Sequence, residues 1–159
     1  MTVTITPTIP ADFSALEPIR LQMSEYFAKL SGEAIQYPKP IESVLSGSSL
    51  PPNGKLENFE LLTIYANDSI VGFAETYYGY PNEQTAYIGL LYLAKRGKGY
   101  GTEAVGQLLN RFRLAGYSRV GLGVLLCNAC GLRFWHKQGF DRITGVNAET
   151  KTVGLVKKI

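Results

Sequence analysis

The sequence predicts a mixed α/β fold in which helices flank a central sheet. Three observations predict it: an amphipathic helix comes first, strand-length apolar segments separated by turn residues follow, and a later helix opens directly after a basic, glycine-rich loop. Apolar residues make up 45% of the 159 residues, which is enough for a hydrophobic core. We find no linker or internal repeat and expect residues 1–159 to form a single domain.

The first helix is predicted over Asp12–Leu30, with Gly32 as its stop signal. Its apolar residues recur at spacings of three and four and therefore form one stripe along the helix. This stripe consists of Leu16, Ile19, Met23, Phe27 and Leu30. The segment Tyr37–Gly54 is rich in Pro, Ser and Gly, and we expect a surface connection there, with one helical turn near Ile41–Leu45.

A meander of strands is predicted next, because apolar runs alternate with turn residues such as Asn67 and Asp68. These strands cover Phe59–Ala66, Ser69–Tyr78 and Thr85–Leu91. A helix then runs from the glycine loop to Gly116, and its apolar face consists of Val105, Leu108, Leu109 and Phe112. The remaining predicted elements are a buried strand at Arg119–Leu126, a helix at Asn128–Gln138, and strands at Phe140–Thr144 and Thr152–Lys157.

Charge and hydropathy exclude several classes of function. The formal net charge is +3 and the basic residues are scattered, so no nucleic-acid partner is indicated. No run approaches ~18 apolar residues and no leader is visible, so we expect a cytoplasmic protein without a membrane partner. Cys127 and Cys130 form a C-x-x-C pattern, but no second pair exists for zinc, and we expect neither a metal nor a disulfide framework.

The most informative segment is 91–102, where a strand end, a basic glycine loop and a helix start follow one another. A helix N-terminus exposes unpaired N–H groups and partial positive charge, and glycines let the backbone approach an anion closely. Lys95, Arg96 and Lys98 add full positive charges. The segment therefore predicts a phosphate or pyrophosphate site, with a plain strand-to-helix turn as the alternative.

The glycine spacing points to a particular class of phosphate ligand. The Walker pattern is absent, and the spacing departs from the dinucleotide fingerprint. The run Arg96-Gly97-Lys98-Gly99-Tyr100-Gly101 instead resembles the coenzyme A motif Q/R-x-x-G-x-G/A of the GNAT N-acetyltransferase superfamily. In that family the backbone amides of this loop hold the pyrophosphate. The resemblance assigns this role to Arg96, Gly97, Lys98, Gly99, Tyr100, Gly101 and Thr102.

A second motif extends the resemblance over about residues 60–140. The strand predicted at Arg119–Leu126 is followed by Asn128, a helix and the pair Gly139-Phe140 at the family's spacing. The resemblance implies that Asn128 contacts the pantetheine arm of the coenzyme. It also implies that the strand before the loop lines the thioester. The residues concerned there are Gly89, Leu90 and Leu91.

The resemblance implies direct transfer of an acetyl group from acetyl-CoA to a primary amine of a small molecule or protein. A general base must take a proton from the amine, and a backbone N–H, here that of Leu91, can stabilise the oxyanion. Glu75 is our candidate base, with Tyr77, Tyr78 and Tyr87 as alternatives. Tyrosines of this strand pair could also line an acceptor pocket, although a solvated carboxylate and aromatic core packing explain the same residues.

Two positions depart from the family pattern. Trp135 stands where the family usually has a Tyr that protonates the thiolate, although Trp135 should still border the coenzyme. Gly123 stands where some relatives carry a Glu that acts as the general base. A catalytically weak, coenzyme A-binding module is therefore an alternative function, and a nucleotide-binding protein of another fold is a third. A homodimer is possible, and the sequence does not indicate the acceptor.

Overall fold

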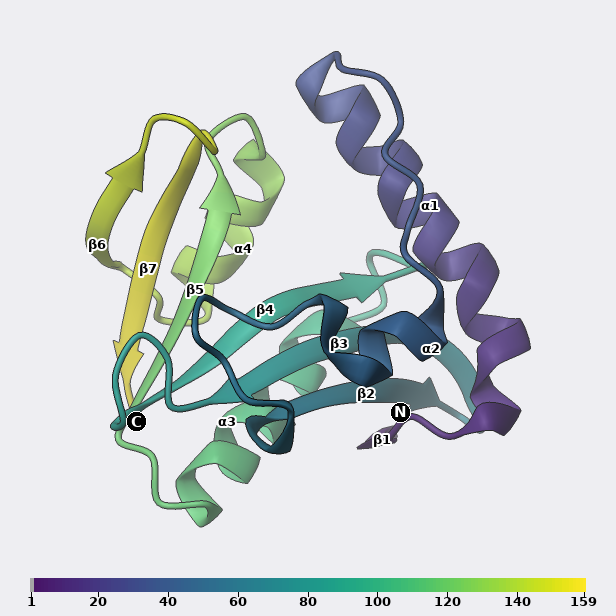
Figure 1. The fold of residues 1–159 in the computed structure, drawn as a ribbon, viewed down its shortest axis with the longest axis horizontal. Helices are drawn as coiled ribbons and strands as arrows, with labels where there is room; N and C mark the ends of the chain where they lie inside the picture. The colour runs from purple at the N-terminus through teal and green to yellow at the C-terminus, as the bar shows by residue number, and fades with distance from the viewer. Residues whose placement is uncertain (1) are drawn as a thin grey trace.

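The computed structural model describes residues 2–159 and contains a seven-stranded sheet flanked by helices (Figure 1). The strands are β1 Val3–Pro7, β2 Phe59–Ala66, β3 Ser69–Tyr78, β4 Thr85–Leu93, β5 Arg119–Leu125, β6 Arg142–Asn147 and β7 Thr152–Lys158. Their spatial order is β1-β2-β3-β4-β5-β7-β6. Within these residues, only β4 and β5 pair in parallel. A parallel pair needs a crossover, which is supplied here by the glycine loop and α3.

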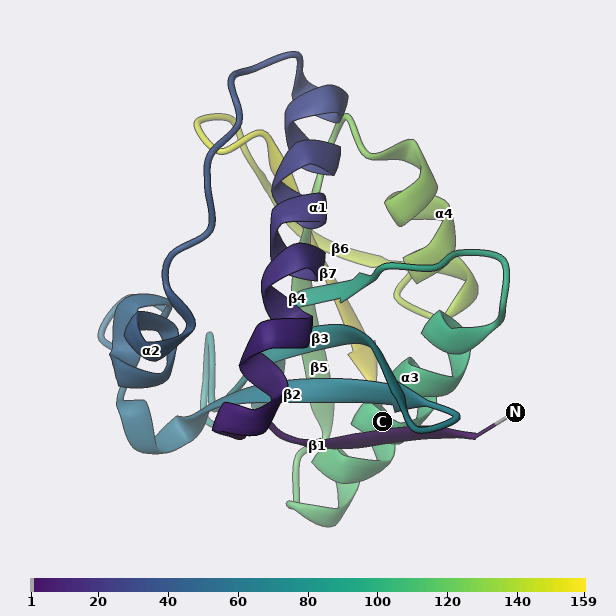
Figure 2. The same ribbon diagram turned by 90° about the vertical axis from the view of Figure 1, so that its right-hand side faces the viewer.

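Four α-helices accompany the sheet in the described chain. They are α1 Phe13–Ser31, α2 Ile41–Ser43, α3 Tyr100–Leu114 and α4 Ala129–Lys137. Short helical turns lie at Pro10–Asp12, Val44–Ser48 and Leu56–Asn58. Figure 2 shows α1 crossing one face of β2, β3 and β4, while α3 and α4 lie on the other side of the sheet.

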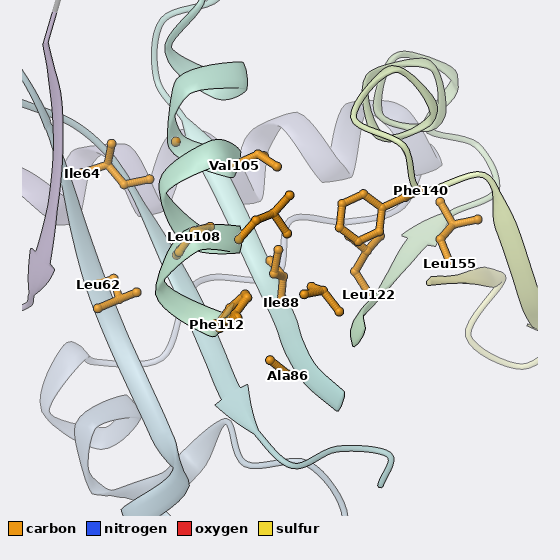
Figure 3. Packing of buried hydrophobic residues seen from close by; sticks show 14 of the residues in the cluster. Leu62, Ile64, Ala86, Ile88, Val105, Leu108, Phe112, Leu122, Phe140 and Leu155 are labelled. Carbon is orange, nitrogen blue, oxygen red and sulfur yellow. The ribbon is translucent and has the colours of Figure 1, made fainter. Parts of the chain in front are cut away.

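The sheet separates two hydrophobic cores, each closed by its own helices. The larger core joins the sheet to α3 and α4 (Figure 3), and its buried members include Leu62, Ile64, Ile88, Leu108, Phe112, Leu122 and Phe140. The smaller core lies under α1 and α2 and includes Leu16, Ile19, Ile41, Leu61 and Phe73. Burial of a side chain of this size stabilises the fold by about 1.5–3 kcal/mol. The apolar stripe predicted for the first helix therefore faces the sheet.

The structure confirms the mixed α/β class and most of the predicted elements. The strands Phe59–Ala66 and Ser69–Tyr78 match their predicted bounds, and Gly32 ends α1 in the left-handed conformation at φ 73°. Two predictions need correction. The edge strand β1 was not predicted, because its alternating Val, Thr and Ile are few and its last residue is a proline, Pro7. The strand predicted at 140–144 begins instead at Arg142, because Phe140 is buried in the core beneath the sheet.

The parallel junction between β4 and β5 is short. It pairs only Thr85 to Ile88 with Arg119 to Leu122. Beyond it the strands diverge, and Figure 1 shows β5, β6 and β7 turning away from β1 to β4. A β-bulge lies at the same point, because Glu75 pairs with Leu90 and Thr76 with Ile88, which leaves Gly89 without a partner on β3. Bulges of this kind redirect the strand and its side chains.

Candidate active site

The divergence leaves one edge of β4 without a neighbouring strand over residues 89–93. The amide of Ala94 donates to the carbonyl of Val71 on β3 over 2.8 Å. Because amide directions alternate along a strand, the amide of Leu91 points away from β3, toward the edge of β4 that lacks a neighbouring strand. A backbone donor is therefore available at the position that the sequence assigned to oxyanion stabilisation.

The glycine loop after β4 has the conformation that an anion site requires. Gly97 and Gly99 have φ of 74° and 77°, a region that L side chains rarely adopt. Gly99 is the N-cap of α3 and contributes no side-chain cap. The amides of Tyr100, Gly101 and Thr102 consequently have no acceptor within the helix. They point outward from the positive end of the helix dipole, which favours a phosphate.

A cavity of about 370 Å³ lies between this loop, the end of β4, α1 and α4, and we call it the loop cavity. The residues predicted to bind coenzyme A that line it are Leu91, Arg96, Gly97, Lys98, Gly99, Tyr100, Gly101, Thr102, Asn128 and Trp135. At Gly101 a Cβ atom would lie 3.0 Å from the Phe134 ring, so glycine allows α3 and α4 to approach here. Gly89 and Leu90 do not line this cavity.

Tyr26 of α1 closes one side of the loop cavity, a contribution that the sequence did not predict. The guanidinium carbon of Arg96 lies 4.4 Å from the centre of its ring, which is a cation–π contact. The Tyr26 hydroxyl donates to Oδ1 of Asn128 over 3.1 Å, and the Gly131 amide donates to the same oxygen over 2.9 Å. Asn128 thus caps α4 with its oxygen and keeps its two N–H donors for a ligand.

Trp135 lines the loop cavity and packs edge-to-face on two aromatic neighbours. Its ring centroid lies 5.0 Å from that of Phe134 and 5.2 Å from that of Phe140. The indole has an N–H but no acidic hydroxyl. Trp135 therefore supplies packing at this position, where the family pattern has a proton donor.

A second cavity, of about 480 Å³, lies between α1, β3 and the segment that follows α1, and we call it the Glu75 cavity. Glu75, Leu90 and Arg20 line it, together with Lys39 from the connection. Phe27 lines both cavities, so the two adjoin each other through this side chain. Phe27 is thus a wall shared by both cavities, and both also border the free edge of β4, the loop cavity at Leu91 and the Glu75 cavity at Leu90.

Glu75 is only 7% exposed on the α1 face of β3. Burial raises the pKa of its carboxyl above the ordinary value of 4.5. The positive charge of Arg20, the Ser49 hydroxyl and the positive charge of Lys39 act in the opposite direction. A carboxylate whose pKa is raised toward neutrality is a better proton acceptor than an exposed one. The geometry thus gives Glu75 the environment of a general base.

The tyrosines proposed as alternatives lie outside both cavities. The Tyr78 hydroxyl donates to Glu60 over 2.9 Å on the α3 face, where Glu60 also pairs with Arg111 at 3.0 Å. The Tyr77 hydroxyl accepts from the Lys55 amide over 2.8 Å. Tyr87 packs on Tyr80 in a separate groove beside β5, β6 and β7. Tyr77 and Tyr78 therefore support the fold, whereas Tyr80 and Tyr87 line the separate groove and neither of the two cavities beside the free edge of β4.

Sequence reasoning missed the contribution of α1 to both cavities. Arg20 follows Leu16 by four residues and precedes Met23 by three, so it lies within the apolar stripe. A lone cation in such a stripe was the available signal. Tyr26 gave no signal, because its role depends on contacts with Asn128, which is 102 residues away.

The C-x-x-C pattern forms no disulfide in the structure, and Cys130 lines the loop cavity. Cys127 and Cys130 are exposed, free thiols. Among residues 2–159, no three His, Cys, Asp or Glu side chains are grouped so that they could hold a metal ion. No helix in the same range combines the length and apolar character needed to cross a membrane.

The model of the acetyltransferase (GNAT) family matches residues 26–140, which is more than half of the chain. The chain therefore belongs to the GNAT acetyltransferase family. The family and the fold that the glycine and Asn128 motifs suggested are thus confirmed. Among curated proteins, none matches the sequence.

Solved structures share the fold at low sequence identity. An acetyltransferase from Thermus thermophilus aligns with a TM-score of 0.79 and 20% identity, over 100% of this chain and 98% of its own. The PaiA N-acetyltransferase of Thermoplasma acidophilum, solved with coenzyme A, gives 0.71 and 20% over 100% of both chains. The aminoglycoside acetyltransferase AAC(6')-Ib, also solved with coenzyme A, gives 0.72 and 18% over 99% of this chain and 95% of its own.

Proposed function

We propose that this chain transfers an acetyl group from acetyl-CoA to a primary amine, and that residues 1–159 form one catalytic domain. The observation that carries the proposal is that the loop cavity and the Glu75 cavity adjoin at Phe27, beside the free edge of β4. Family membership supports acetyl transfer. Two structural neighbours, PaiA and the aminoglycoside enzyme, were solved with coenzyme A, which supports this choice of donor.

In this proposal the loop cavity binds the coenzyme. The amides of segment 97–102 and the charges of Lys98 and Arg96 hold the pyrophosphate, because the helix start and the glycines present N–H groups to an anion. The side-chain N–H groups of Asn128 face the pantetheine amides. Trp135 borders the arm by apolar contact.

The Glu75 cavity receives the amine in the same proposal. The amine nitrogen forms a bond to the acyl carbon, the carbon–sulfur bond breaks, and the released proton passes to Glu75 directly or through water. The amide of Leu91 donates to the carbonyl oxygen as negative charge develops on it. The raised pKa of Glu75 suits this proton transfer. No covalent enzyme intermediate is required.

The leaving thiolate needs little help, because an unperturbed thiol has a pKa near 8.5. Tyr26 provides a hydroxyl in the loop cavity, next to Asn128, where Trp135 provides none. Because the one proton of this hydroxyl is donated to Asn128, we assign to Tyr26 the role of orienting Asn128 toward the pantetheine arm. The alternative function, a module that binds coenzyme A without efficient transfer, is favoured by Trp135 and Gly123, which both depart from the family pattern.

The test is a turnover assay that follows free thiol release from acetyl-CoA with a panel of primary amines, alongside calorimetric titration with acetyl-CoA, ATP and NAD. We expect acetyl-CoA to bind in preference to both nucleotides and thiol release to depend on the amine. Binding without amine-dependent release would favour the module. Preference for ATP or NAD would refute the assignment of the loop.

A further inference from the structure

Arg20 is a buried cation in the wall of the Glu75 cavity. It lies on the sheet-facing side of α1 and is only 5% exposed. Its Nε atom is buried and has no hydrogen-bond partner among residues 2–159. Leu16 and Met23, one helical turn away on either side, are buried apolar residues. Arg20 is therefore not part of a solvated helix face.

A guanidinium in this position needs an acceptor. It remains charged at all accessible pH values and presents five N–H donors. An unpaired buried charge costs several kcal/mol, so buried charges in proteins are normally paired or used. In the described part of the chain, Glu75 and Glu17 are the acidic groups that act on Arg20 electrostatically. Neither of these two carboxylates forms an ion pair with it within 4.0 Å.

The cavity therefore presents a cation and a carboxyl group that are close enough to interact but are not joined directly. Lys39, whose ammonium donates to the Ser48 carbonyl, adds a second positive charge to the same wall. Glu33 lines the cavity as well, and both Glu33 and Lys39 are exposed, so water screens their opposite charges more than that of the buried Arg20. A ligand that brings a negative group to Arg20 and an amine to Glu75 satisfies both sides.

We propose that the acceptor is an amino acid, whose carboxylate is bound by Arg20 while its amine faces Glu75. A carboxylate matches the guanidinium fork, since two parallel N–H groups can donate to its two oxygens. The cavity volume of about 480 Å³ suits a molecule of this size. This inference rests on the proposed function, and it excludes lysine side chains and protein N-termini as preferred acceptors, because neither carries a carboxylate beside the amine.

The first test needs no variant. Thiol release is measured with the common L-amino acids, each compared with its carboxamide and its decarboxylated amine. We expect kcat/KM to be about 10- to 100-fold higher for the amino acid that is used best, the range of a charge-assisted hydrogen bond. Amides or decarboxylated amines that react equally well overturn the inference and leave the proposed function standing. No release with any amine overturns both.

The second test assigns the carboxylate to Arg20. The variant Arg20→Gln should lose about 10- to 100-fold in kcat/KM for the amino acid and less than about twofold for its amide. Arg20→Lys should recover part of the loss, and Lys29→Gln, at an exposed position on the same helix, should change neither. An equal loss for acid and amide means that Arg20 only supports the fold or Glu75, and it overturns the inference. If Arg20→Gln does not fold, the comparison of acceptors on the unaltered protein decides.

Discussion

Replacement of Glu75 by Gln should remove the proton acceptor while keeping the shape of the side chain. A positioned general base contributes about 10²- to 10⁴-fold to a rate. This corresponds to about 2.7–5.4 kcal/mol of activation free energy. Because Glu75 is only 7% exposed, we expect a loss in the upper part of that range. Binding of acetyl-CoA should not change, since Glu75 does not line the loop cavity.

The pH profile gives a sharper criterion than the rate. A base must be unprotonated to act, so kcat/KM of the unaltered protein should fall as the pH drops through the pKa of Glu75. Burial raises that pKa, and the acidic limb should therefore lie above the ordinary carboxyl value of 4.5. In Glu75→Gln this limb should disappear, and only ionisation of the amine should remain.

The assay is thiol release at saturating acetyl-CoA between pH 5 and 10, with thermal unfolding as a check on folding. Glu57→Gln is the matched control, because Glu57 is exposed and lines neither cavity. A loss below about threefold in Glu75→Gln would refute the role of Glu75 as the base, and so would a second, steeper fall in kcat/KM at acidic pH that persists in the variant beyond the fall caused by ionisation of the amine.

Three further outcomes follow from particular contacts. Gly99→Glu should abolish measurable binding of acetyl-CoA by calorimetry, because it places a negative charge at the loop, whereas Gly99→Asn, which tolerates positive φ, should keep most of the affinity. Tyr26→Phe removes the hydrogen bond to Asn128 and should lower kcat about two- to tenfold, as measured by thiol release. The pKa of Tyr78 is raised to about 12 by burial first and then by its bond to Glu60. The unfolded state loses this proton near pH 10 and the folded state near pH 12, so the free energy of unfolding should fall across that window by at most about 2.7 kcal/mol, and by less in Tyr78→Phe.

Each outcome can fail independently of the others. Tight binding by Gly99→Glu would remove the loop from the coenzyme site. An unchanged kcat in Tyr26→Phe would show that the hydrogen bond between Tyr26 and Asn128 does not contribute to transfer. Equal slopes of stability against pH in the unaltered protein and in Tyr78→Phe, both followed by urea unfolding, would show that the burial of this phenol does not affect stability at high pH.

Local signals in the sequence predicted most elements and the loop, because periodicity and glycine spacing act within a few residues. The bounds of β2 and β3 and the start of α3 after the basic glycines are of this kind. The glycine and Asn128 motifs were enough to predict the family, because the coenzyme loop depends on a backbone conformation that few sequences allow.

What could not be predicted depends on contacts between distant segments. Arg20 and Glu75 line one cavity only because α1 crosses the sheet above β3. Tyr26 reaches Asn128 for the same reason. The roles of the tyrosines in the predicted strands were ambiguous. Alternation along a strand defines two faces but does not tell which face a helix covers. Trp135 departs from the family motif, and its role is defined by the rings of its neighbours.

The four-residue parallel junction between β4 and β5 has a mechanical consequence. Within residues 2–159 it is the only strand pairing that joins the N-terminal lobe, with β1 to β4, to the C-terminal lobe, with β5 to β7. A coenzyme bound along the unpaired end of β4 would contact both lobes. It would therefore add contacts between the lobes to those of the four-residue β4–β5 junction. Acetyl-CoA at about 100 times its Kd should then stabilise the whole chain by about 2.7 kcal/mol, and protection from hydrogen exchange should be concentrated in the residues of β4 and β5 next to this junction.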